Sequence, residues 1–537
     1  MNKRSRFKLV ILSILIFLCI KLNAQNPVSE NKPIEISDFA PMHKFLSSDW
    51  MEGRETGEKG SFIASDYIAS MMEVYGIEPY GDTREPSTFD KNNRLYFQTF
   101  EVIKYKTETA SLALVSQNKD SRVVTQFSLG IDFEVQAACK SISGEGNIVF
   151  AGYGINAPEI GYDDYKKLNV DGRVVMIMDG FPGFKNEKST SYNKFLSGTS
   201  EAKTSKEAKL KSAMSHGAIG VILINASNPI KNATINTAFL KMTMNTDKFI
   251  DPDYDDYDFT LPDEEENKNI PLFKISQEVA RELLNGSGIN LKEIETKTEQ
   301  NLISYSQELR KSLAFSVTVN SQAIAVRNVL GIIPGKDRTK NIIIGAHYDH
   351  LGIRDGQIYN GSDDNASGTT GMLTLLKYWK NKSETPPVNL IFAAWAAEEK
   401  GHWGSIFFAN KFDCNPQNTL LNINFDMISR SASEDITGLT LSVGTMKRDE
   451  DLRTLSTKNN LLLEKPFSLD LWDTATGGGS DYATFDRRDI SVMTFFSGFH
   501  DDYHSFRDIS FYADYGKMKA ILNLANSCLK DFIETIN

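Results

Sequence analysis

Histidines and carboxylates stand at the ends of several apolar runs in this 537-residue sequence. The apolar runs 342–346, 390–397 and 421–425 each end directly before such residues, and a loop with two histidines follows the run 492–496. The residues concerned are His347, Asp349, Glu398, Glu399, Asp426 and His504. Imidazole and carboxylate groups ligate divalent metals and transfer protons, so these residue types point to a catalytic metal site.

A Gly-rich loop at 360–368 adds more acidic residues, and it opens the helix that follows His347 in the sequence. A single carboxylate in such a loop is more often a helix cap than a ligand, and Asp364 and Asn365 are candidates to cap the helix that begins near Ala366. Several uncompensated carboxylates at one edge would repel each other, however, and a pair of divalent cations removes that repulsion. The pattern therefore favours a site for two metal ions.

The types of donor atom narrow the choice of metal. Cys139, Cys414 and Cys528 are far apart in the sequence, which excludes a cysteine-based site. Histidine and carboxylate ligands suit catalytic zinc. Side chains of consecutive residues in extended backbone point in opposite directions, so one of Glu398 and Glu399 can ligate a metal while the other acts as a general base. Asp349, two residues after His347, is placed to orient its imidazole.

The elements that must position these residues follow an alternating pattern from about residue 325 onward. Apolar strands are predicted at 326–333, 341–345, 388–395, 422–425 and 491–496, and a helix at 368–379. Strands that alternate with helices predict an α/β fold with a mostly parallel central sheet flanked by helices. Sites in such folds form beyond the carboxyl ends of the strands, where the polar residues stand here.

The N-terminal residues have the pattern of a signal peptide. Four cations precede an apolar run of about 12 residues, which is too short to span a bilayer comfortably. We expect cleavage after residue 24, export to the periplasm or secretion, and no membrane span afterwards. The net charge is −11 and the chain has no basic block, which argues against nucleic acid as a partner.

The motifs together resemble the M28 family of di-zinc metallopeptidases, which includes bacterial aminopeptidases. The matching strings are GAHYDHLG at 345–352, GSDDNASG at 361–368, AEE at 397–399, NFDM at 424–427, GSD at 479–481 and DYH at 502–504. The string EGRETG at 52–57 resembles the start of such peptidases. The middle of the chain is similar to a protease-associated (PA) domain, on the strings GYGI at 152–155 and AMSHGAIGV at 213–221.

The resemblance implies a domain order of a signal peptide at 1–24, the first part of the peptidase domain at 25–108, an inserted β-rich PA domain at 109–304, and the catalytic domain at 305–537. It also implies an exopeptidase of the aminopeptidase type with peptide substrates and two Zn²⁺ ions per chain. His347 and Asp426 would bind one zinc, Glu399 and His504 the other. Asp363 would bridge the two ions.

In the same resemblance, Glu398 is the general base that takes a proton from a water shared by the two ions and passes it to the leaving amine. Asp349 is the second catalytic residue, through the imidazole of His347. His350, His402 and His500 lie near the motifs and are candidates for contact with the substrate or with ligands.

Other functions stay open at this point. A carboxypeptidase for acidic C-termini or a dipeptidase would use the same metal chemistry, and the former would need a cationic pocket, for which Arg430, Arg487, Arg488 and Arg507 are available. A glutaminyl cyclase-like transferase shares the fold type, but the complete two-metal ligand set argues against it. A receptor-like binding module with a dead site would have lost ligands, whereas all five are present here. Oligomeric state and the preferred N-terminal residue are left undecided by the sequence.

Overall fold

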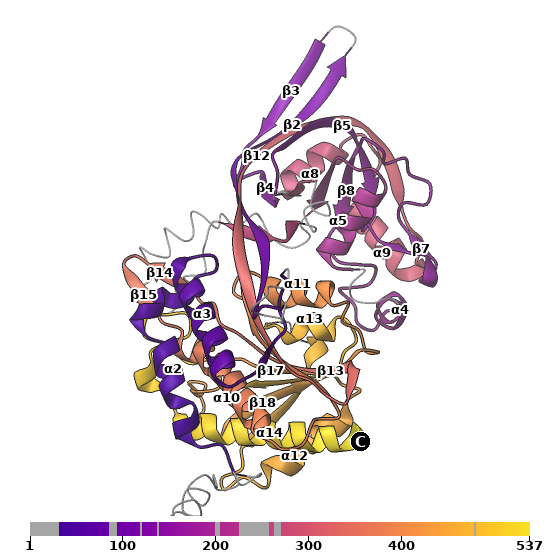
Figure 1. Ribbon diagram of the computed structural model, residues 1–537. Helices are drawn as coiled ribbons and strands as arrows, with labels where there is room; N and C mark the ends of the chain where they lie inside the picture. Colours follow the sequence, from indigo (N-terminus) through magenta and orange to yellow (C-terminus); the bar gives the residue numbers. More distant parts are fainter. Residues whose placement is uncertain are drawn as a thin grey trace, which may run out of the picture. The chain divides into compact units, whose positions relative to one another are not determined.

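The computed structural model describes residues 32–84, 94–118, 121–136, 139–198, 204–224, 257–262, 270–476 and 479–536 (Figure 1). The predicted signal peptide at 1–24 lies outside these residues. The described chain forms two compact units, one made of the residues up to Phe100 and from Ala325 onward, the other of the residues between Glu101 and Ile324. Each unit is described separately below.

The first unit is built on a sheet in which seven strands lie in a continuous row. Their bounds are β12 Ser306–Ile333 (from Ala325 in this unit), β13 Asp337–His347, β16 Val388–Trp395, β17 Thr419–Phe425, β18 Thr440–Thr445, β19 Ser468–Asp473 and β20 Val492–Phe496. Their order is β19-β18-β20-β17-β13-β16-β12. Four of the pairs are parallel, and β12 with β16 and β18 with β20 are antiparallel. The predicted mostly parallel central sheet is thus confirmed.

Helices cover both faces of this sheet. On one face lie α10 Gly368–Lys380, α12 Glu450–Asn460 and α14 Tyr515–Ile536, and on the other α11 Trp403–Lys411 and α13 Tyr482–Asp486 (Figure 1). All eight residues of β16 are buried, because a strand covered on both faces needs apolar side chains in both directions. Trp395 of this strand packs against Phe408 of α11, with ring centroids 5.1 Å apart.

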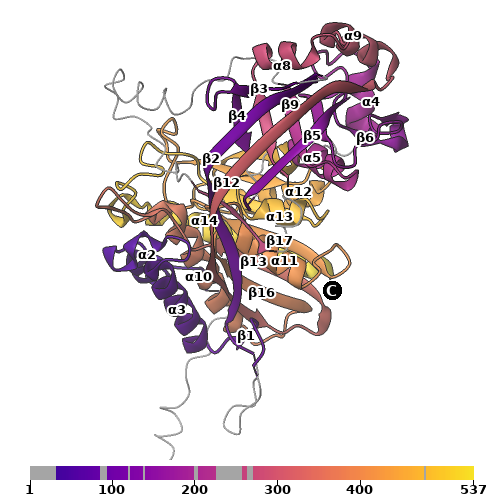
Figure 2. The same ribbon diagram turned by 90° about the horizontal axis from the view of Figure 1, so that it is seen from above.

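The N-terminal residues belong to this unit as well. They form η1 Ile36–Asp38, α2 Ala40–Leu46, η2 Asp49–Arg54, α3 Lys59–Val74 and β1 Glu78–Pro79. Figures 1 and 2 show α2 and α3 beside α10, and β1 pairs with the end of β12. The remaining elements of the unit are short: β14 Gly352–Arg354, β15 Gln357–Tyr359, η6 Ser362–Ser367, η7 Thr474–Thr476 and η8 Ser510–Tyr512.

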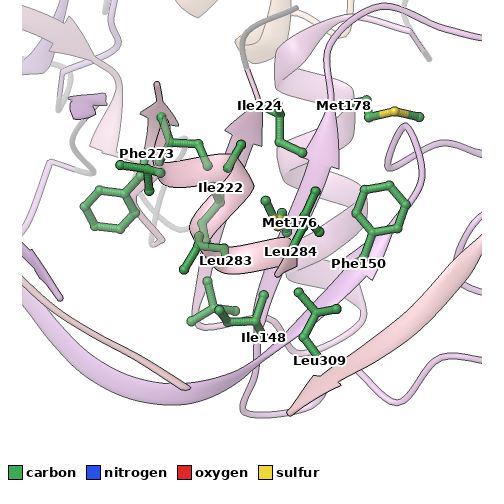
Figure 3. Close-up of a cluster of buried hydrophobic side chains, with 14 of the residues drawn as sticks. Ile148, Phe150, Met176, Met178, Ile222, Ile224, Phe273, Leu283, Leu284 and Leu309 are labelled. Atoms are coloured by element: carbon green, nitrogen blue, oxygen red, sulfur yellow. The ribbon is translucent and has the colours of Figure 1, made fainter. Parts of the chain in front are cut away.

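The second unit is built on strands that bury alternate residues on two faces. Its central strands, in spatial order, are β5 Ile142–Ala151, β8 Val174–Met178, β9 Gly220–Ile224 and β11 Leu272–Ile275, and the three pairings between them are parallel. Ile148, Met176, Ile222 and Phe273 share one core with Leu283 of helix α8 Gln277–Leu284 (Figure 3). The intervening residues form a second core with α5 Lys206–Ser215. Alternate side chains of each strand point to opposite faces of the sheet, and both faces are covered. These strands are therefore apolar along their whole length.

The other elements of this unit surround that sheet. They are β2 Phe97–Asn118, β3 Ser121–Phe127, β4 Phe133–Gln136, β6 Asn156–Ala157, η3 Pro158–Ile160, β7 Tyr162–Asp163, α4 Thr190–Gly198, β10 Asp258–Thr260 and α9 Leu291–Asn301. The inserted domain was predicted at 109–304. That range stays a prediction. The two compact units divide after Phe100, within β2, and after Ile324, within β12. No helix among the described residues is both long and apolar enough to cross a bilayer.

Candidate metal centre

Three neighbouring parallel strands deliver polar side chains to one edge of the first unit's sheet. The strand β13 ends in His347, β16 leads into Glu398 and Glu399, and β17 ends directly before Asp426. The strands lie in the order β17-β13-β16, so their carboxyl ends are adjacent. The structure therefore places these residues together at one edge of the sheet, as expected.

Asp364 from η6 lies at the centre of this gathering. Its Oδ1 is 3.4 Å from Nε2 of His347, and its Oδ2 is 3.1 Å from Nε2 of His504. Nε2 of His347 also lies 3.4 Å from Oδ1 of Asp426, and Nε2 of His504 lies 3.4 Å from Oε2 of Glu399. The two oxygens of one carboxylate thus face two separate groups of donors, one on each side.

These donors fit a pair of divalent metal ions. Ligands at about 2.0–2.1 Å from a tetrahedral zinc stand about 3.3 Å from one another, and the four separations above are 3.1 to 3.4 Å. Two groups of such side chains share Asp364: one contains His347 and Asp426, the other His350, Glu399 and His504. The donors are imidazole nitrogen and carboxylate oxygen, which zinc accepts in catalytic sites.

The prediction that Asp363 bridges the two ions is wrong in this structure, where Asp364 holds the central position. Oδ1 of Asp363 accepts hydrogen bonds from the backbone N–H and the hydroxyl of Ser429, at 2.6 and 2.9 Å. Its Oδ2 lies 3.4 Å from Nε2 of His500, away from the other ligands. Asn365, not Asp364, accepts the Gly368 N–H at the start of α10. Asp364 is thereby left to face the histidines.

Asp349 lies behind the centre and contacts three neighbours. Its Oδ2 accepts a hydrogen bond from Thr56 Oγ1 at 2.8 Å, and its Oδ1 accepts the Glu398 N–H at 3.1 Å. The carboxylate is 3.9 Å from Nδ1 of His347, whereas the backbone oxygen of Asp349 is 3.2 Å from that nitrogen. The imidazole is thus oriented mainly by the backbone of Asp349, and the carboxylate links Thr56 to the loop of Glu398.

The two adjacent glutamates have opposite electrostatic environments. Burial raises the pKa of Glu398 well above its usual range, and the nearby Asp426 and Glu399 add to this effect. Burial acts on Glu399 in the same direction, but His504 and His350 outweigh it and hold the pKa of Glu399 well below the usual range. Glu399 is therefore ionised, as a carboxylate that binds a metal must be, whereas Glu398 is the group suited to carry a proton.

Two histidines, which the sequence placed only near the motifs, contact these glutamates directly. Nδ1 of His350 lies 2.6 Å from Oε1 of Glu399, a hydrogen-bond distance that is shorter than the spacing of two ligands on one zinc. Nε2 of His402 lies 3.3 Å from Oε1 of Glu398. The signal that could have identified His350 is its place three residues after His347, within the same loop.

A cavity of about 260 Å³ opens onto the donors. His347, Asp364, Glu398, Glu399 and Asp426 line part of it. The rest of the lining is mostly apolar and consists of Met427, Trp472, Tyr482, Phe496, Phe499 and Tyr503, together with Gly479, Ser480 and Thr494. No lysine or arginine is among the described residues that line this cavity. The arrangement suits a substrate with an apolar side chain beside a hydrolytic centre.

A family profile and several curated proteins match part of this chain. Residues 328–528 match the profile of "Peptidase family M28". "Leucine aminopeptidase 2" of Trichophyton rubrum is 32% identical over 176 residues, which are 32% of this chain and 33% of that protein. A "Probable glutamate carboxypeptidase" of Arthroderma benhamiae is 23% identical over 38% of this chain and 30% of its own length. The chain thus spans about a third of the length of the curated relatives it matches.

A solved structure extends the likeness beyond the matched region. An aminopeptidase from Aneurinibacillus sp. strain AM-1 is similar to this chain with a TM-score of 0.51 at 16% identity, over 92% of this chain and 93% of that one. At such identity the likeness concerns the fold alone. The α/β sheet, the donors at its carboxyl edge and the matched profile lead to one conclusion: residues 328–528 of this chain form a peptidase family M28 domain.

Proposed function

We propose that this protein is an exported, zinc-dependent aminopeptidase that removes N-terminal residues from peptides. The observation that carries the proposal is the position of Asp364, whose two carboxylate oxygens face His347 on one side and His504 on the other. In the proposed site, His347 and Asp426 would hold one zinc, Glu399 and His504 would hold the second, and Asp364 would contribute a carboxylate oxygen to each. The intact donor set speaks against a receptor-like module with a dead site.

Glu398 is the proposed general base. When bound, the two ions supply Lewis acidity, which polarises the scissile carbonyl and acidifies a water molecule. The carboxylate of Glu398 lines the cavity beside the donors, takes the proton of that water and returns it to the leaving amine. Its backbone N–H is held by Asp349, and its Oε1 lies 3.3 Å from His402. These contacts keep the carboxylate at the edge of the site.

The cavity supports an apolar or aromatic N-terminal residue as the preferred substrate. Its six large apolar and aromatic side chains line the same cavity as the donors, so burial of the substrate's side chain there contributes binding energy. A carboxypeptidase for acidic C-termini would need a cation for the free carboxylate. Among the described residues, Arg430 and Arg507 instead bind Asp502, so they do not favour that alternative.

The test is hydrolysis of a panel of aminoacyl-p-nitroanilides by residues 25–537, before chelation, after it and after zinc is restored. Release that chelation abolishes and zinc restores, with leucine or phenylalanine ahead of aspartate and lysine, supports the proposal. If the zinc-loaded protein releases nothing from the panel but cleaves peptides with free C-termini, the protein is a carboxypeptidase and not an aminopeptidase. Export is tested separately, by the N-terminal sequence of the protein recovered outside the cytoplasm.

A further inference from the structure

The segment 49–56, named the brace here, contacts two of the loops next to the donors. It consists of η2 and the two residues that follow it, and it contains most of the string EGRETG that stands out in the sequence. The proposed function assigns this segment no role. Its contacts, however, converge on the loop 348–350, which follows His347, and on the loop 360–364, which contains Asp364.

Arg54 is the centre of the brace. Its side chain is fully buried, and its guanidinium donates four hydrogen bonds to backbone oxygens. Nε donates to Tyr348 O at 2.7 Å, while Nη1 and Nη2 donate to Asn360 O and Gly361 O at 2.6 and 2.8 Å. The fourth bond, also from Nη1, reaches Leu46 O at 2.7 Å. The planar, forked guanidinium therefore bonds to the backbone of the loop that follows His347 and to the backbone of the loop that contains Asp364.

The backbone conformation of the brace positions the forked guanidinium of Arg54. Glu52, Gly53 and Arg54 all have positive φ angles, of 48°, 68° and 54°. A Cβ on Gly53 would lie 2.4 Å from Gly352 O and 2.6 Å from Tyr359 O, so only glycine allows the approach to these loops. The carbonyl of Arg54 in turn accepts the His350 N–H at 3.2 Å.

Side chains on either side of Arg54 extend the same contacts. The hydroxyl of Thr56 donates to Asp349 Oδ2 at 2.8 Å, and Asp349 in turn accepts the Glu398 N–H. Asp49 Oδ1 accepts a hydrogen bond from Asn360 Nδ2 at 2.8 Å. Burial lowers the pKa of Arg54 to about 10, with Asp364, Asp508, Asp349 and Glu399 opposing that effect, so the guanidinium stays charged at neutral pH among these carboxylates.

We propose that Arg54 is a positioning residue of the metal centre, which sets the separation of His347 and Asp364 by holding the backbones of their two loops. The inference rests on the proposed function, because it needs a metal site to position. Without the fork, the loops are free to move apart, and the donors must be ordered by the metal itself, which costs affinity.

The experiment measures zinc affinity of the full chain by competition with a chromophoric chelator. Arg54→Met is expected to lower the affinity by about 10- to 100-fold, and Arg54→Lys, which keeps the charge but not the fork, to lower it as well but by less. The visible spectrum of the Co²⁺-substituted protein should shift in both variants, since it reports ligand geometry directly.

Arg327→Met is the matched control. Arg327 also binds the N-terminal part of the unit, through Ser65, Phe62 and Asp66 in α3. Its backbone oxygen accepts the Tyr348 hydroxyl at 2.8 Å, a bond that the substitution keeps. This variant should keep the wild-type zinc affinity and cobalt spectrum even where it lowers the melting temperature. An equal loss of affinity in Arg327→Met would overturn the proposal, because it would show a general effect of weakened packing.

Thr56→Val decides the matter should Arg54→Met not fold. The substitution keeps the volume and removes only the hydrogen bond to Asp349, and an affinity loss of about 10-fold, reversed in Thr56→Ser, is expected. Wild-type affinity in folded Arg54→Lys and Thr56→Val would overturn the inference and leave the proposed function intact. Absence of zinc binding by the wild-type protein would overturn both.

Discussion

Oδ2 of Asp364 lies 3.1 Å from Nε2 of His504, although 140 residues separate the two in the chain. The pairing brings the C-terminal loop of the domain onto the loop that precedes α10. The backbone N–H of Asp364 is held in addition by Asp508, at 3.1 Å. Because the other oxygen of Asp364 faces His347, this one side chain connects both groups of donors.

The role of Asp364 separates it from its neighbour Asp363. Asp364→Asn removes one anionic oxygen from the centre, so we expect it to lower zinc affinity at both positions and to abolish hydrolysis. Asp363→Asn should keep two zinc ions, because its carboxylate binds Ser429 and lies away from the other donors. Metal content after dialysis measures both variants. Loss of zinc in Asp363→Asn with retention in Asp364→Asn would reverse the assignment.

The adjacent glutamates should respond differently to the same substitution. Glu398→Gln is expected to retain the metal ions and to lose about 10²- to 10⁴-fold in turnover, because only the proton acceptor is removed. Glu399→Gln should also lose metal, since His504 and His350 lose their anionic partner. Kinetics and metal content of the two purified variants provide the comparison. Equal metal loss in both would rule out this division of roles.

Phe499 is expected to contribute to substrate binding and not to the chemical step. Its ring lines the cavity, is 57% exposed, and lies 4.7 Å from the ring of Tyr503. Phe499→Ala removes apolar contact worth about 1 kcal/mol, so KM for a leucine substrate should rise roughly fivefold while kcat changes little. Phe511→Ala is the control, since Phe511 is exposed and does not line the cavity. A fall in kcat alone would contradict this role.

His43 of α2 should make the stability of the first unit sensitive to acid. Burial lowers the pKa of His43 to about 4. Nε2 lies 2.8 Å from Ser362 O, consistent with donation by a neutral imidazole. The unfolded chain takes up a proton near pH 6.5, whereas the folded protein does not until about pH 4, so stability falls as the pH drops below 6.5.

The corresponding loss is about 2 kcal/mol between pH 7 and pH 5. His43→Gln keeps a donor for Ser362 O and cannot be protonated, so its melting temperature in the presence of chelator should depend less on pH than that of the wild-type protein. Parallel profiles for the two proteins over this range would show that His43 does not cause the acid sensitivity.

The sequence predicts the buried parts of the fold better than its edges. The strand β16 has the predicted bounds, because it is a nearly continuous apolar run with clear ends, and α10, most of whose residues are buried, ends one residue later than predicted. The strands β18 and β19 were not predicted, since they lie at the edge of the sheet, where polar and apolar residues mix without a continuous run. The PA-domain resemblance of the second unit stays a prediction.

The candidate site was predicted with one substitution and one omission. His347, Glu398, Glu399, Asp426 and His504 all lie around the cavity or in contact with its donors. Sequence spacing cannot tell whether Asp363 or Asp364 faces the other donors. That depends on which of the two carboxylates contacts Ser429 and His500, and these contacts arise only in the fold. His350 lies three residues after His347, within the same loop, so its place in the sequence is a signal for its contact with Glu399. The contacts of Arg54 join distant segments, and such contacts leave no local pattern in a single sequence.

The most direct test of the account is the number of zinc ions that one chain binds. The chelator-treated wild-type protein and Asp364→Asn are dialysed against zinc and analysed by mass spectrometry of the metal content. We expect two ions per wild-type chain, with hydrolysis of leucine-p-nitroanilide restored as they bind, and fewer than two in Asp364→Asn. A wild-type chain that binds no zinc, or two ions bound equally well without the Asp364 carboxylate, would contradict it.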